Sequence, residues 1–419
     1  MSSVPVTFSL SRRGLLGSAA ALAAVASCQP RAAQPPLVET SAPPLDPRDW
    51  TSVRAQFALD QRLAHLAAFV FAAPPAQVRE AIARHRAGFD ANTVEYLHAN
   101  EGMMERSIHQ WAAGYLGVRT DEIMFTDSTT MGLGLLYHGL KLSPGDEILT
   151  SEHDFFATHE SLRFRAERDG VRVNRVRLYQ DPFNTSVDEI VSNLARAFTP
   201  ATKVVALTWV HSGTGVKLPV REIASFLNGR ALLCLDSVHG FGAQDAGPAE
   251  LGCDFLISGC HKWLFGPRGT GLIWGTPAAW ARYQPSIPTF QPERRPQSTP
   301  GGYHAFEHQW ALAETFDFHK RIGRDRIAAR VHELNGRLKD GLAGIKGVRL
   351  ITPRSPDLSA GIVCCVVGDS EPPELVVRLR DKGVVASASP YNPSYLRFGA
   401  SIATLEADVD KAIDTVRGL

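Results

Sequence analysis

Residues 258–269 read Ser-Gly-Cys-His-Lys-Trp-Leu-Phe-Gly-Pro-Arg-Gly, and this stretch carries the strongest indication of the fold and of the site. A short apolar run, Phe255–Ile257, precedes this stretch and predicts a buried strand. Lys262 then emerges from a glycine-rich, partly apolar loop. Such a setting lowers the pKa of an amine and makes it a competent nucleophile. The alternative is a solvated loop lysine, which is what most lysines are.

A carboxylate lies upstream of this lysine in a similar setting. Asp236 follows the apolar run Ala231–Leu235, so its side chain is expected in a low-dielectric environment where it needs a cationic partner. The protonated nitrogen of a pyridine ring is such a partner, and His239 can donate to a phenolic oxygen of that ring or stack on it. Alone, Asp236 would be interpreted as a helix N-cap. Together with Lys262 it favours a cofactor site.

A third segment, Ser128-Thr-Thr-Met-Gly132, follows the predicted strand Glu122–Phe125 and opens a helix. Hydroxyl groups and backbone N–H groups at a helix start suit a dianionic phosphate, although an ordinary helix cap uses the same residues. All three segments follow predicted strands, and open α/β sheets bind ligands at the carboxyl ends of their strands. We therefore expect the three segments to converge.

The pattern around these segments predicts the fold class. From about Pro74 helical stretches alternate with short apolar runs, which is typical of an α/β domain built on one large, mainly parallel, doubly wound sheet of seven strands. The strands are expected at Glu122–Phe125, Glu147–Thr150, Val171–Arg177, Lys203–Trp209, Ala231–Leu235, Phe255–Ile257 and Gly271–Trp274.

A proline-rich stretch divides the chain. Gln284–Gly302 contains five prolines and two adjacent arginines, which excludes regular structure and marks a boundary or an active-site loop. Long helices are expected over His308–Gly344, followed by a smaller α/β domain and a closing helix at Leu405–Val416. We assign residues 48–300 to an N-terminal arm and a large domain, and residues 301–419 to the small domain. The small domain's strands are expected at Val348–Ile351, Gly361–Val367, Gly383–Ala386 and Leu396–Phe398.

The N-terminus has the composition of an export signal. Ser11-Arg-Arg-Gly-Leu-Leu-Gly17 is a twin-arginine motif, and the apolar run after it, up to Ser27, is too short to span a bilayer comfortably. Val25-Ala-Ser-Cys28 resembles a lipobox, in which Cys28 is lipidated; an ordinary cleavage site is the alternative. We expect residues 1–28 to be the signal, residues 29–47 a linker rich in Pro, Ala and Gln, and the protein to be periplasmic, as an outer-membrane lipoprotein if Cys28 is lipidated.

Overall charge and cysteine usage narrow the classes further. The chain has 44 Lys and Arg against 43 Asp and Glu, so no basic field points to nucleic acid, and we expect a small-molecule or peptide substrate. Cys234, Cys364 and Cys365 lie in predicted strands and indicate structural thiols. Cys253 and Cys260 could form a disulfide, although free thiols are the preferred interpretation.

From about residue 60 to the C-terminus the sequence resembles the class V aminotransferases, fold-type I enzymes that use pyridoxal 5'-phosphate (PLP). The specific part is His261-Lys-Trp263 with Gly266-Pro-Arg-Gly269, which is most similar to the isopenicillin N epimerase-like branch. The resemblance implies a homodimer. It also implies that Lys262 forms the internal aldimine, Asp236 pairs with the pyridine nitrogen and His239 lies near the phenolic oxygen.

The same resemblance implies further contacts. Thr129 and Thr130 would hold the phosphate with help from Ser258 or His261. Phe155 would stack on the ring, with His153 as the alternative, and Ser212 would contact the oxygen side of the cofactor. Arg397, in the run Tyr395–Ser401, would anchor the substrate carboxylate because its planar fork matches a carboxylate; a surface arginine is the alternative.

Two departures from the family pattern concern the chemistry. Residues 386–395 read Ala-Ser-Ala-Ser-Pro-Tyr-Asn-Pro-Ser-Tyr and contain no thiol, whereas cysteine desulfurases need a nucleophilic cysteine there. Desulfuration is therefore not expected. The segment Gly301–Trp310 lacks the Gly-Thr pair that reaches the partner subunit's phosphate in many epimerase-like members, which makes His304 and His308 the candidates for that contact.

The expected activity is transamination of an amino acid or of a peptide glutamyl group, with Lys262 removing and returning the proton. The peptide is included because exported twin-arginine relatives modify siderophore peptides at a glutamyl group. An epimerase or a carbon–sulfur lyase would use the same lysine. A protein of another class, a non-catalytic binding protein on the same fold, has no need for a buried carboxylate beside a reactive amine.

Overall fold

The computed structural model of the chain describes residues 43–291 and 295–419. The twin-arginine motif, the apolar run after it and Cys28 lie outside the described residues. Within the described ranges, no helix combines the length and the apolar character needed to cross a bilayer.

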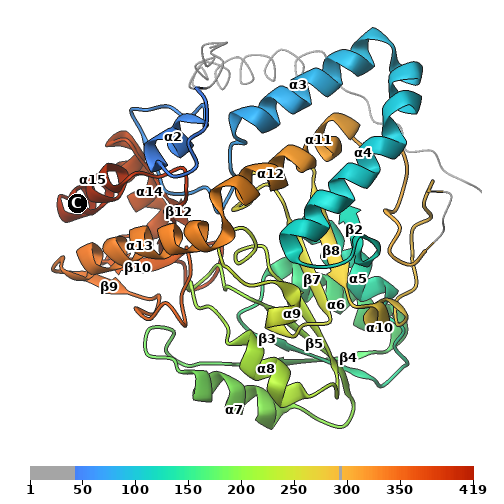
Figure 1. Ribbon diagram of the computed structural model, residues 1–419. Helices are drawn as coiled ribbons and strands as arrows, with labels where there is room; N and C mark the ends of the chain where they lie inside the picture. The colour runs from blue at the N-terminus through green and yellow to red at the C-terminus, as the bar shows by residue number, and fades with distance from the viewer. Residues whose placement is uncertain (1–42, 292–294) are drawn as a thin grey trace, which may run out of the picture. The chain divides into compact units, whose positions relative to one another are not determined.

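A seven-stranded sheet forms the centre of the fold, in the order β2-β8-β7-β6-β5-β3-β4 (Figure 1). All seven predicted strands are present with ends shifted by no more than two residues. Strands β7, β6, β5, β3 and β4 are parallel, whereas β8 runs antiparallel to β7 and to β2. The strands are β2 (Ile123–Thr126), β3 (Glu147–Ser151), β4 (Arg172–Val176), β5 (Thr202–Thr208), β6 (Leu232–Asp236), β7 (Phe255–Gly259) and β8 (Gly271–Gly275).

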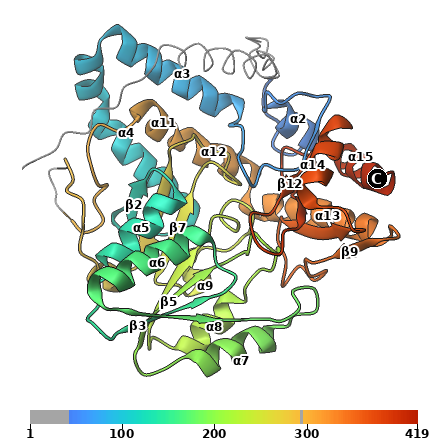
Figure 2. The same cartoon turned by 180° about the vertical axis from the view of Figure 1, so that it is seen from behind.

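Helices cover both faces of this sheet because its strands are apolar on both sides. Along β6, for example, Leu233 and Leu235 join one core cluster, while Leu232 and Cys234 join the other. The first face is covered by α4 (Thr93–Leu116), α7 (Val187–Ala197), α8 (Val220–Leu227), α9 (Pro248–Leu251) and α12 (Leu312–Ile322). The second is covered by α5 (Thr129–Gly139), α6 (Phe156–Asp169) and α10 (Pro277–Trp280), and Figure 2 shows α5 and α6 in front of the strands.

A smaller antiparallel sheet of four strands lies apart from the large one, in the order β12-β13-β10-β9. It packs with three helices in a separate core, which is coloured from orange at α13 to dark red at the C-terminus in Figures 1 and 2. Its strands are β9 (Val348–Leu350), β10 (Val363–Val367), β12 (Ser387–Ala388) and β13 (Leu396–Phe398), and its helices are α13 (Arg324–Ala343), α14 (Pro372–Asp381) and α15 (Glu406–Arg417).

One predicted strand has a different partner from the one we expected. The run Gly383–Ala386 forms β11 (Val384–Val385), which is outside the four-stranded sheet and pairs in parallel with β1 (Ala64–His65). The short strand β12 takes its place beside β13. Strands of two residues carry no periodic pattern, so the sequence did not predict β1 or β12.

The remaining described helices are α2 (Trp50–Ala55), α3 (Ala76–Ala91) and α11 (Phe306–Trp310), with a short 3₁₀ turn, η1 (Thr120–Glu122). Residues 284–291 and 295–302, the described part of the proline-rich stretch, contain no helix or strand, as predicted. The five cysteines of the described ranges are buried free thiols. The alternative of a Cys253–Cys260 disulfide is therefore wrong, and the interpretation as structural thiols is confirmed.

The carboxyl ends of the central strands meet the start of α5. Thr208 at the end of β5 is the register partner of Asp236 at the end of β6. The backbone N–H of Gly259, which ends β7, donates to Oγ1 of Thr129 over 2.7 Å. The three segments that carry the predicted chemistry therefore converge, as expected for a doubly wound sheet.

Candidate active site

A cavity of about 140 Å³ lies at this edge of the sheet, and we call it the Lys262 cavity. Eight of the ten predicted site residues line it; Ser258 and Arg397 do not. Its lining consists of Ser128, Thr129, Thr130, Phe155, Thr208, Ser212, Asp236, Val238, His239, His261 and Lys262.

Lys262 is positioned by the turn that follows β7. The backbone N–H of Phe265 donates to the carbonyl of Lys262 (3.0 Å), and the N–H of Gly266 donates to the carbonyl of Cys260 (2.7 Å). Burial lowers the pKa of the lysine amine to about 8, with Asp236 opposing the shift and Arg397 adding to it. The amine is therefore deprotonated more readily than that of a solvated lysine, which suits a nucleophile.

Asp236 is buried, and its two oxygens have different surroundings. Oδ1 accepts the backbone N–H of Val238 over 3.1 Å, so this half of the carboxylate caps a turn. Oδ2 is buried and has no hydrogen-bond partner. Burial raises the pKa of Asp236 to about 6, since the N–H of Val238 and the nearby Lys262 compensate only in part. A cationic ring nitrogen would satisfy the unpaired oxygen.

His239 is held by an aromatic neighbour that the sequence did not reveal. Nε1 of Trp263, which can only donate, lies 3.4 Å from Nδ1 of His239. Burial lowers the pKa of His239 well below its usual value, so the ring is neutral. With Nδ1 accepting, the ring proton is assigned to Nε2, where it is available to an oxygen acceptor.

The start of α5 combines a cap with a free helix end. Oγ of Ser128 accepts the backbone N–H of Met131 (3.1 Å), which makes Ser128 the N-cap of the helix. Thr129 is buried and accepts from Gly259, whereas Thr130 is exposed. The N–H groups of Thr129 and Thr130 are the first of the helix and have no carbonyl partner inside it. An anion is stabilised at such a helix end.

Of the two residues expected to assist at the phosphate, His261 lines the cavity and Ser258 does not. Oγ of Ser258 donates to the carbonyl of Gly259 over 2.9 Å, whereas Nδ1 of His261 is buried without a partner. Similarly, Phe155 lines the cavity, but His153 lies outside it with its ring stacked on Tyr179 at 3.9 Å between centroids. Geometry favours His261 and Phe155 for the two positions.

Arg397 lies behind the cavity wall and not in its lining. Its Nη1 donates to the carbonyl of Ser212 (3.0 Å), and its Nη2 donates to Ser387 Oγ (2.9 Å) and the carbonyl of Ala388 (3.0 Å). Nε is buried and has no partner. Arg397 is therefore not a surface arginine. One of its donors remains available, and its charge acts on both Lys262 and His239.

The structure adds residues that the sequence reasoning missed. Thr208 lines the cavity, and its Oγ1 is buried without a partner. Its backbone N–H donates to Oδ1 of Asp154 (2.6 Å), a buried carboxylate that also accepts from the N–H of Ser151. Thr208 is the last residue of β5 and is paired in register with Asp236, the last residue of β6. The strand-end argument that singled out Asp236 could have found it too.

The two histidines proposed for a contact across the dimer lie elsewhere in this chain. Nδ1 of His308 is 2.9 Å from the carbonyl of Arg268, and Nδ1 of His304 is 3.7 Å from Oδ1 of Asp127. Neither histidine lines the Lys262 cavity. Their part in a contact with a partner subunit stays a prediction.

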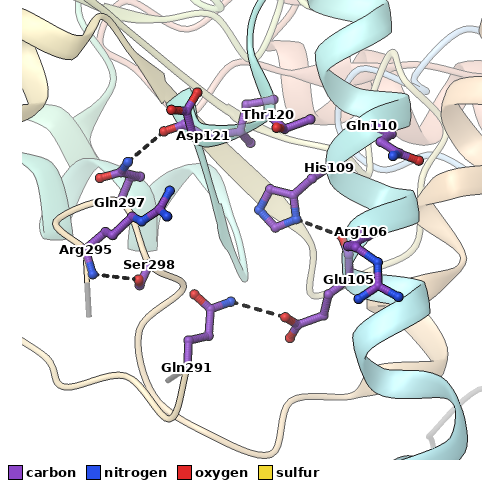
Figure 3. Close-up of a pocket in the computed structure, with 11 residues that line it drawn as sticks. Glu105, Arg106, His109, Gln110, Thr120, Asp121, Gln291, Arg295, Gln297 and Ser298 are labelled. Carbon is purple, nitrogen blue, oxygen red and sulfur yellow. Dashed lines mark hydrogen bonds between the residues drawn. The ribbon is translucent and has the colours of Figure 1, made fainter. Parts of the chain in front are cut away.

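A second cleft, of about 360 Å³, lies between α4 and the proline-rich stretch, and Figure 3 shows its lining. Several of its polar side chains bond to neighbours: Gln291 donates to Glu105 (3.5 Å), and Gln297 donates to the carbonyl of Asp121 (2.7 Å). None of the described residues that line it has a buried polar side-chain atom without a partner, unlike Asp236, His261 and Thr208. Of these two spaces, the Lys262 cavity is the one with unpaired buried groups for a polar ligand.

The Lys262 cavity fits PLP, part by part. An amine of lowered pKa faces the cavity, a buried carboxylate oxygen lacks a partner, a neutral histidine can donate, and a helix start is available for phosphate. The large parallel sheet with this site at its carboxyl edge defines a fold-type I PLP-dependent enzyme.

The chain belongs to the aminotransferase class-V family, whose model matches residues 72–390. It is 26% identical to isopenicillin N epimerase of Streptomyces clavuligerus over 394 residues, which is 88% of this chain and 98% of the epimerase. Among solved structures it is similar to a C-DES mutant with glycine covalently linked to the PLP cofactor (TM-score 0.78, 19% identity, 87% of this chain and 98% of that one). It is also similar to the cysteine desulfurase of Thermococcus onnurineus NA1 in its apo form (TM-score 0.77, 20% identity, 88% and 97%).

Proposed function

We propose that this enzyme is a transaminase that acts on the amino group of an amino acid or of a peptide glutamyl residue. The observation that carries the proposal is the pairing, on one cavity, of a lysine whose pKa is lowered with a buried carboxylate oxygen that lacks a partner. Bound PLP supplies an electron sink for the pair left when a bond to the substrate α-carbon breaks.

The residues of the chain would divide the remaining work. Lys262 would hold the cofactor covalently and then move the proton at the substrate α-carbon. Oδ2 of Asp236 would accept the ring N–H, and Nε2 of His239 would donate to the phenolic oxygen, with Ser212 beside it. Thr129, Thr130 and His261 would hold the phosphate at the start of α5, and Phe155 would pack on the ring.

Epimerisation is the second candidate, because the similarity to isopenicillin N epimerase spans nearly that whole enzyme. Both reactions begin with removal of the α-proton, so the same residues would serve. Desulfuration is less well supported: residues 386–395, where the desulfurase nucleophile would lie, contain no cysteine.

A single set of incubations separates these reactions. The cofactor-loaded enzyme is mixed with single amino acids of either configuration and with glutamyl peptides, without an amino acceptor. A transaminase converts the cofactor to its aminated form, seen by its absorbance, with one equivalent of keto acid. Inverted stereochemistry with unchanged cofactor would identify an epimerase, and pyruvate release with unchanged cofactor would identify a lyase. A purified protein that stays colourless after PLP is added would refute the enzymatic proposal as a whole.

We also propose that the enzyme is exported by the twin-arginine route and carries a lipid on Cys28. The support is the sequence of residues 11–28 alone. In a bacterial host, Arg12→Lys together with Arg13→Lys should leave the protein in the cytoplasm. Cys28→Ser should release it from the membrane fraction into the soluble periplasm. If Cys28→Ser leaves the membrane association unchanged, the lipid anchor is disproved.

A homodimer is proposed on similar grounds, with one supporting feature of the described chain. Large apolar side chains are exposed beside the Lys262 cavity, including Phe156 next to Phe155 and Met131 next to Thr130. Exposed apolar groups near a site mark contact surfaces. Sedimentation at micromolar concentration should give twice the chain mass, and Phe156→Asp should shift the equilibrium toward the monomer.

A further inference from the structure

A third pocket opens beside the Lys262 cavity. It has a volume of about 420 Å³, roughly three times that of the Lys262 cavity, and is bounded by segments 152–153, 177–182, 211–214 and 391–395. We call it the distal pocket. Its walls come from the ends of β3 and β4, from the turn after β5 and from the loop between β12 and β13.

The wall between the two spaces is a side-chain pair. Ser212 lines the Lys262 cavity and Tyr391 lines the distal pocket, and their hydroxyl oxygens are 2.6 Å apart. The Tyr391 ring packs close to Gly213, where an added Cβ would lie 3.0 Å from the ring. Arg397 donates to the carbonyl of the same Ser212. A substrate held by Arg397 at its carboxylate would therefore have its side chain beside Tyr391.

The interior of the distal pocket carries no net charge. The lining contains one lysine or arginine, Arg177, whose Nε pairs with Glu152 at 2.7 Å. Burial lowers the pKa of both His153 and His211 to about 3, so both rings are neutral. Binding a charged group here would cost desolvation without a free partner of opposite charge.

The lining is instead aromatic and able to form hydrogen bonds. The His153 ring lies flat against Tyr179, and the Tyr179 hydroxyl is 2.9 Å from His211 Nδ1 and 2.8 Å from Thr214 Oγ1. Nε2 of His153 is buried without a hydrogen-bond partner, and Nε2 of His211, which also makes no hydrogen bond, lies 3.8 Å from Oδ1 of the buried Asp154. Flat rings and spare hydrogen-bonding atoms suit a planar, uncharged group such as an amide or an aryl amide.

We propose that the distal pocket binds the far end of the amino substrate, and that this end is an uncharged, planar amide-bearing group extending beyond the length of a free amino acid. Tyr391 is a positioning residue that directs the substrate side chain from the Lys262 cavity into the distal pocket. The inference rests on the proposed function in so far as the substrate carries an α-amine and an α-carboxylate.

Binding can be measured apart from chemistry with α-methyl amino acids, because their α-carbon has no proton to lose. The probes are α-methylglutamate, its γ-anilide and its γ-aspartyl amide, titrated into the cofactor-loaded enzyme by calorimetry. We expect the anilide to bind at least about tenfold more tightly than α-methylglutamate, a difference of about 1.4 kcal/mol. The charged aspartyl derivative should lack this advantage.

A matched pair of variants locates the effect. Gln180 is exposed at the distal pocket, and only its backbone N–H, which donates to Glu189 (3.0 Å), is used in the fold. Gln180→Trp should block the pocket and remove the tenfold advantage of the anilide while leaving α-methylglutamate binding unchanged. Gln110→Trp makes the same replacement at an exposed residue of the cleft in Figure 3 and should alter neither.

The outcomes distinguish this inference from the proposed function. An anilide that binds no better than α-methylglutamate, or an advantage that survives Gln180→Trp, overturns the distal pocket as a subsite. Equal affinity for the anilide and the aspartyl derivative overturns its preference for uncharged groups. Failure of the transaminase proposal appears separately, as the absence of aminated cofactor with unmethylated substrates.

Discussion

Lys262 and Asp236 share one cavity, and burial moves their pKa values toward each other, to about 8 for the lysine and about 6 for the aspartate. Burial disfavours the charged form of each group, and each opposes the shift of the other. Near neutral pH the two groups therefore lie close to their titration points while the site holds no cofactor. PLP would provide the partner that each lacks, an aldehyde for the amine and a ring cation for the carboxylate.

The lowered pKa of Lys262 predicts how cofactor loading depends on pH. Only the neutral amine attacks the aldehyde, so the loading rate of the cofactor-free protein should rise with pH and reach half of its plateau near pH 8. An ordinary lysine would place the midpoint more than two pH units higher. The rate is followed by absorbance. A lysine peptide measured in parallel corrects the pH profile for the ionisations of PLP itself. Lys262→Ala should load no covalent cofactor, and a borohydride-reducible band in that variant would assign the attachment elsewhere.

The raised pKa of Asp236 predicts a pH-dependent stability of the cofactor-free protein. Between about pH 4 and pH 6 the folded state binds more protons than the unfolded state, so Asp236 makes folding less favourable as pH rises through this window. Asp236→Asn removes the titration. On going from pH 4 to pH 7 the variant should gain on the order of 3 kcal/mol relative to the unsubstituted chain, since one pKa unit corresponds to about 1.36 kcal/mol.

Urea unfolding at the two pH values measures this difference. The affinity for PLP should change in the opposite direction. Asp236→Asn should bind PLP more weakly than the unsubstituted chain, because asparagine cannot balance the charge of the ring cation. If the stability difference between the two proteins were the same at pH 4 and pH 7, the carboxylate would not be titrating as its burial implies.

At this scale the sequence predicted the residues whose signal is local. Lys262, Asp236 and His239 follow apolar runs at strand ends, and the Ser128–Gly132 segment opens a helix after another such run. The family resemblance, not a local signal, implied Phe155, Ser212 and His261, which line the same cavity. Contacts made across elements were not predictable. The donation from Trp263 to His239 and the contact between Ser212 and Tyr391 depend on how loops fold back, and no periodicity encodes that.

Helix α5 brings the phosphate-binding end of the site against the sheet, and one of its glycines makes this possible. A Cβ at Gly132 would lie 2.7 Å from Cγ2 of Ile257 on β7, whereas one at Gly134 would meet nothing within 4 Å. Gly132→Ala should therefore destabilise the protein by about 1–3 kcal/mol through overpacking. Gly134→Ala, in the same helix, should stabilise it by up to about 1 kcal/mol.

Thermal unfolding measures both substitutions, and PLP titration adds a second measurement. Because α5 must move away from β7 to accept the extra methyl group, Gly132→Ala should also weaken PLP binding. Gly134→Ala should leave PLP affinity unchanged. Equal effects of the two substitutions would mean that the close contact between α5 and β7 is not maintained in solution.

Strands with a run of apolar residues could be predicted from the sequence. The pairing of two-residue strands, which exist only through their contact with another segment, could not. Every strand of the large sheet has at least four residues, and all of them except the edge strand β4 contain an apolar run. Strands β1, β11 and β12 have two residues each, and β1 pairs with β11 across more than 300 positions of the chain. A pairing of this kind depends on the packing of the C-terminal core, which no local stretch of sequence describes.

For the molecule as a whole, Arg397 connects the two sheets at the site. Arg397 belongs to β13 of the small sheet, yet it donates to Ser212, in the turn that follows β5 of the large sheet. It also bonds to Ser387 and Ala388 of β12. A substrate carboxylate at its unpaired Nε would thus join both sheets to the ligand.

This arrangement predicts the effect of Arg397→Lys. A lysine keeps the charge but cannot supply the forked donors, so affinity for a carboxylate-bearing substrate should fall by about 10- to 100-fold, the value of one or two hydrogen bonds to a charged group. The decarboxylated amine of the same substrate should lose nothing, because it never uses the arginine. The loss should appear in KM for the acid, and the unfolding temperature should fall because carbonyl contacts of Ser212 and Ala388 are lost.

Arg349→Lys is the matched control for that variant, since Arg349 lies on β9 of the same small sheet with its side chain exposed. It should change neither KM nor the unfolding temperature. An Arg397→Lys enzyme that loses affinity equally for the acid and for the amine would assign Arg397 a purely structural part, joining β12 and β13 to the large domain. A loss confined to the acid identifies Arg397 as the group that binds the carboxylate.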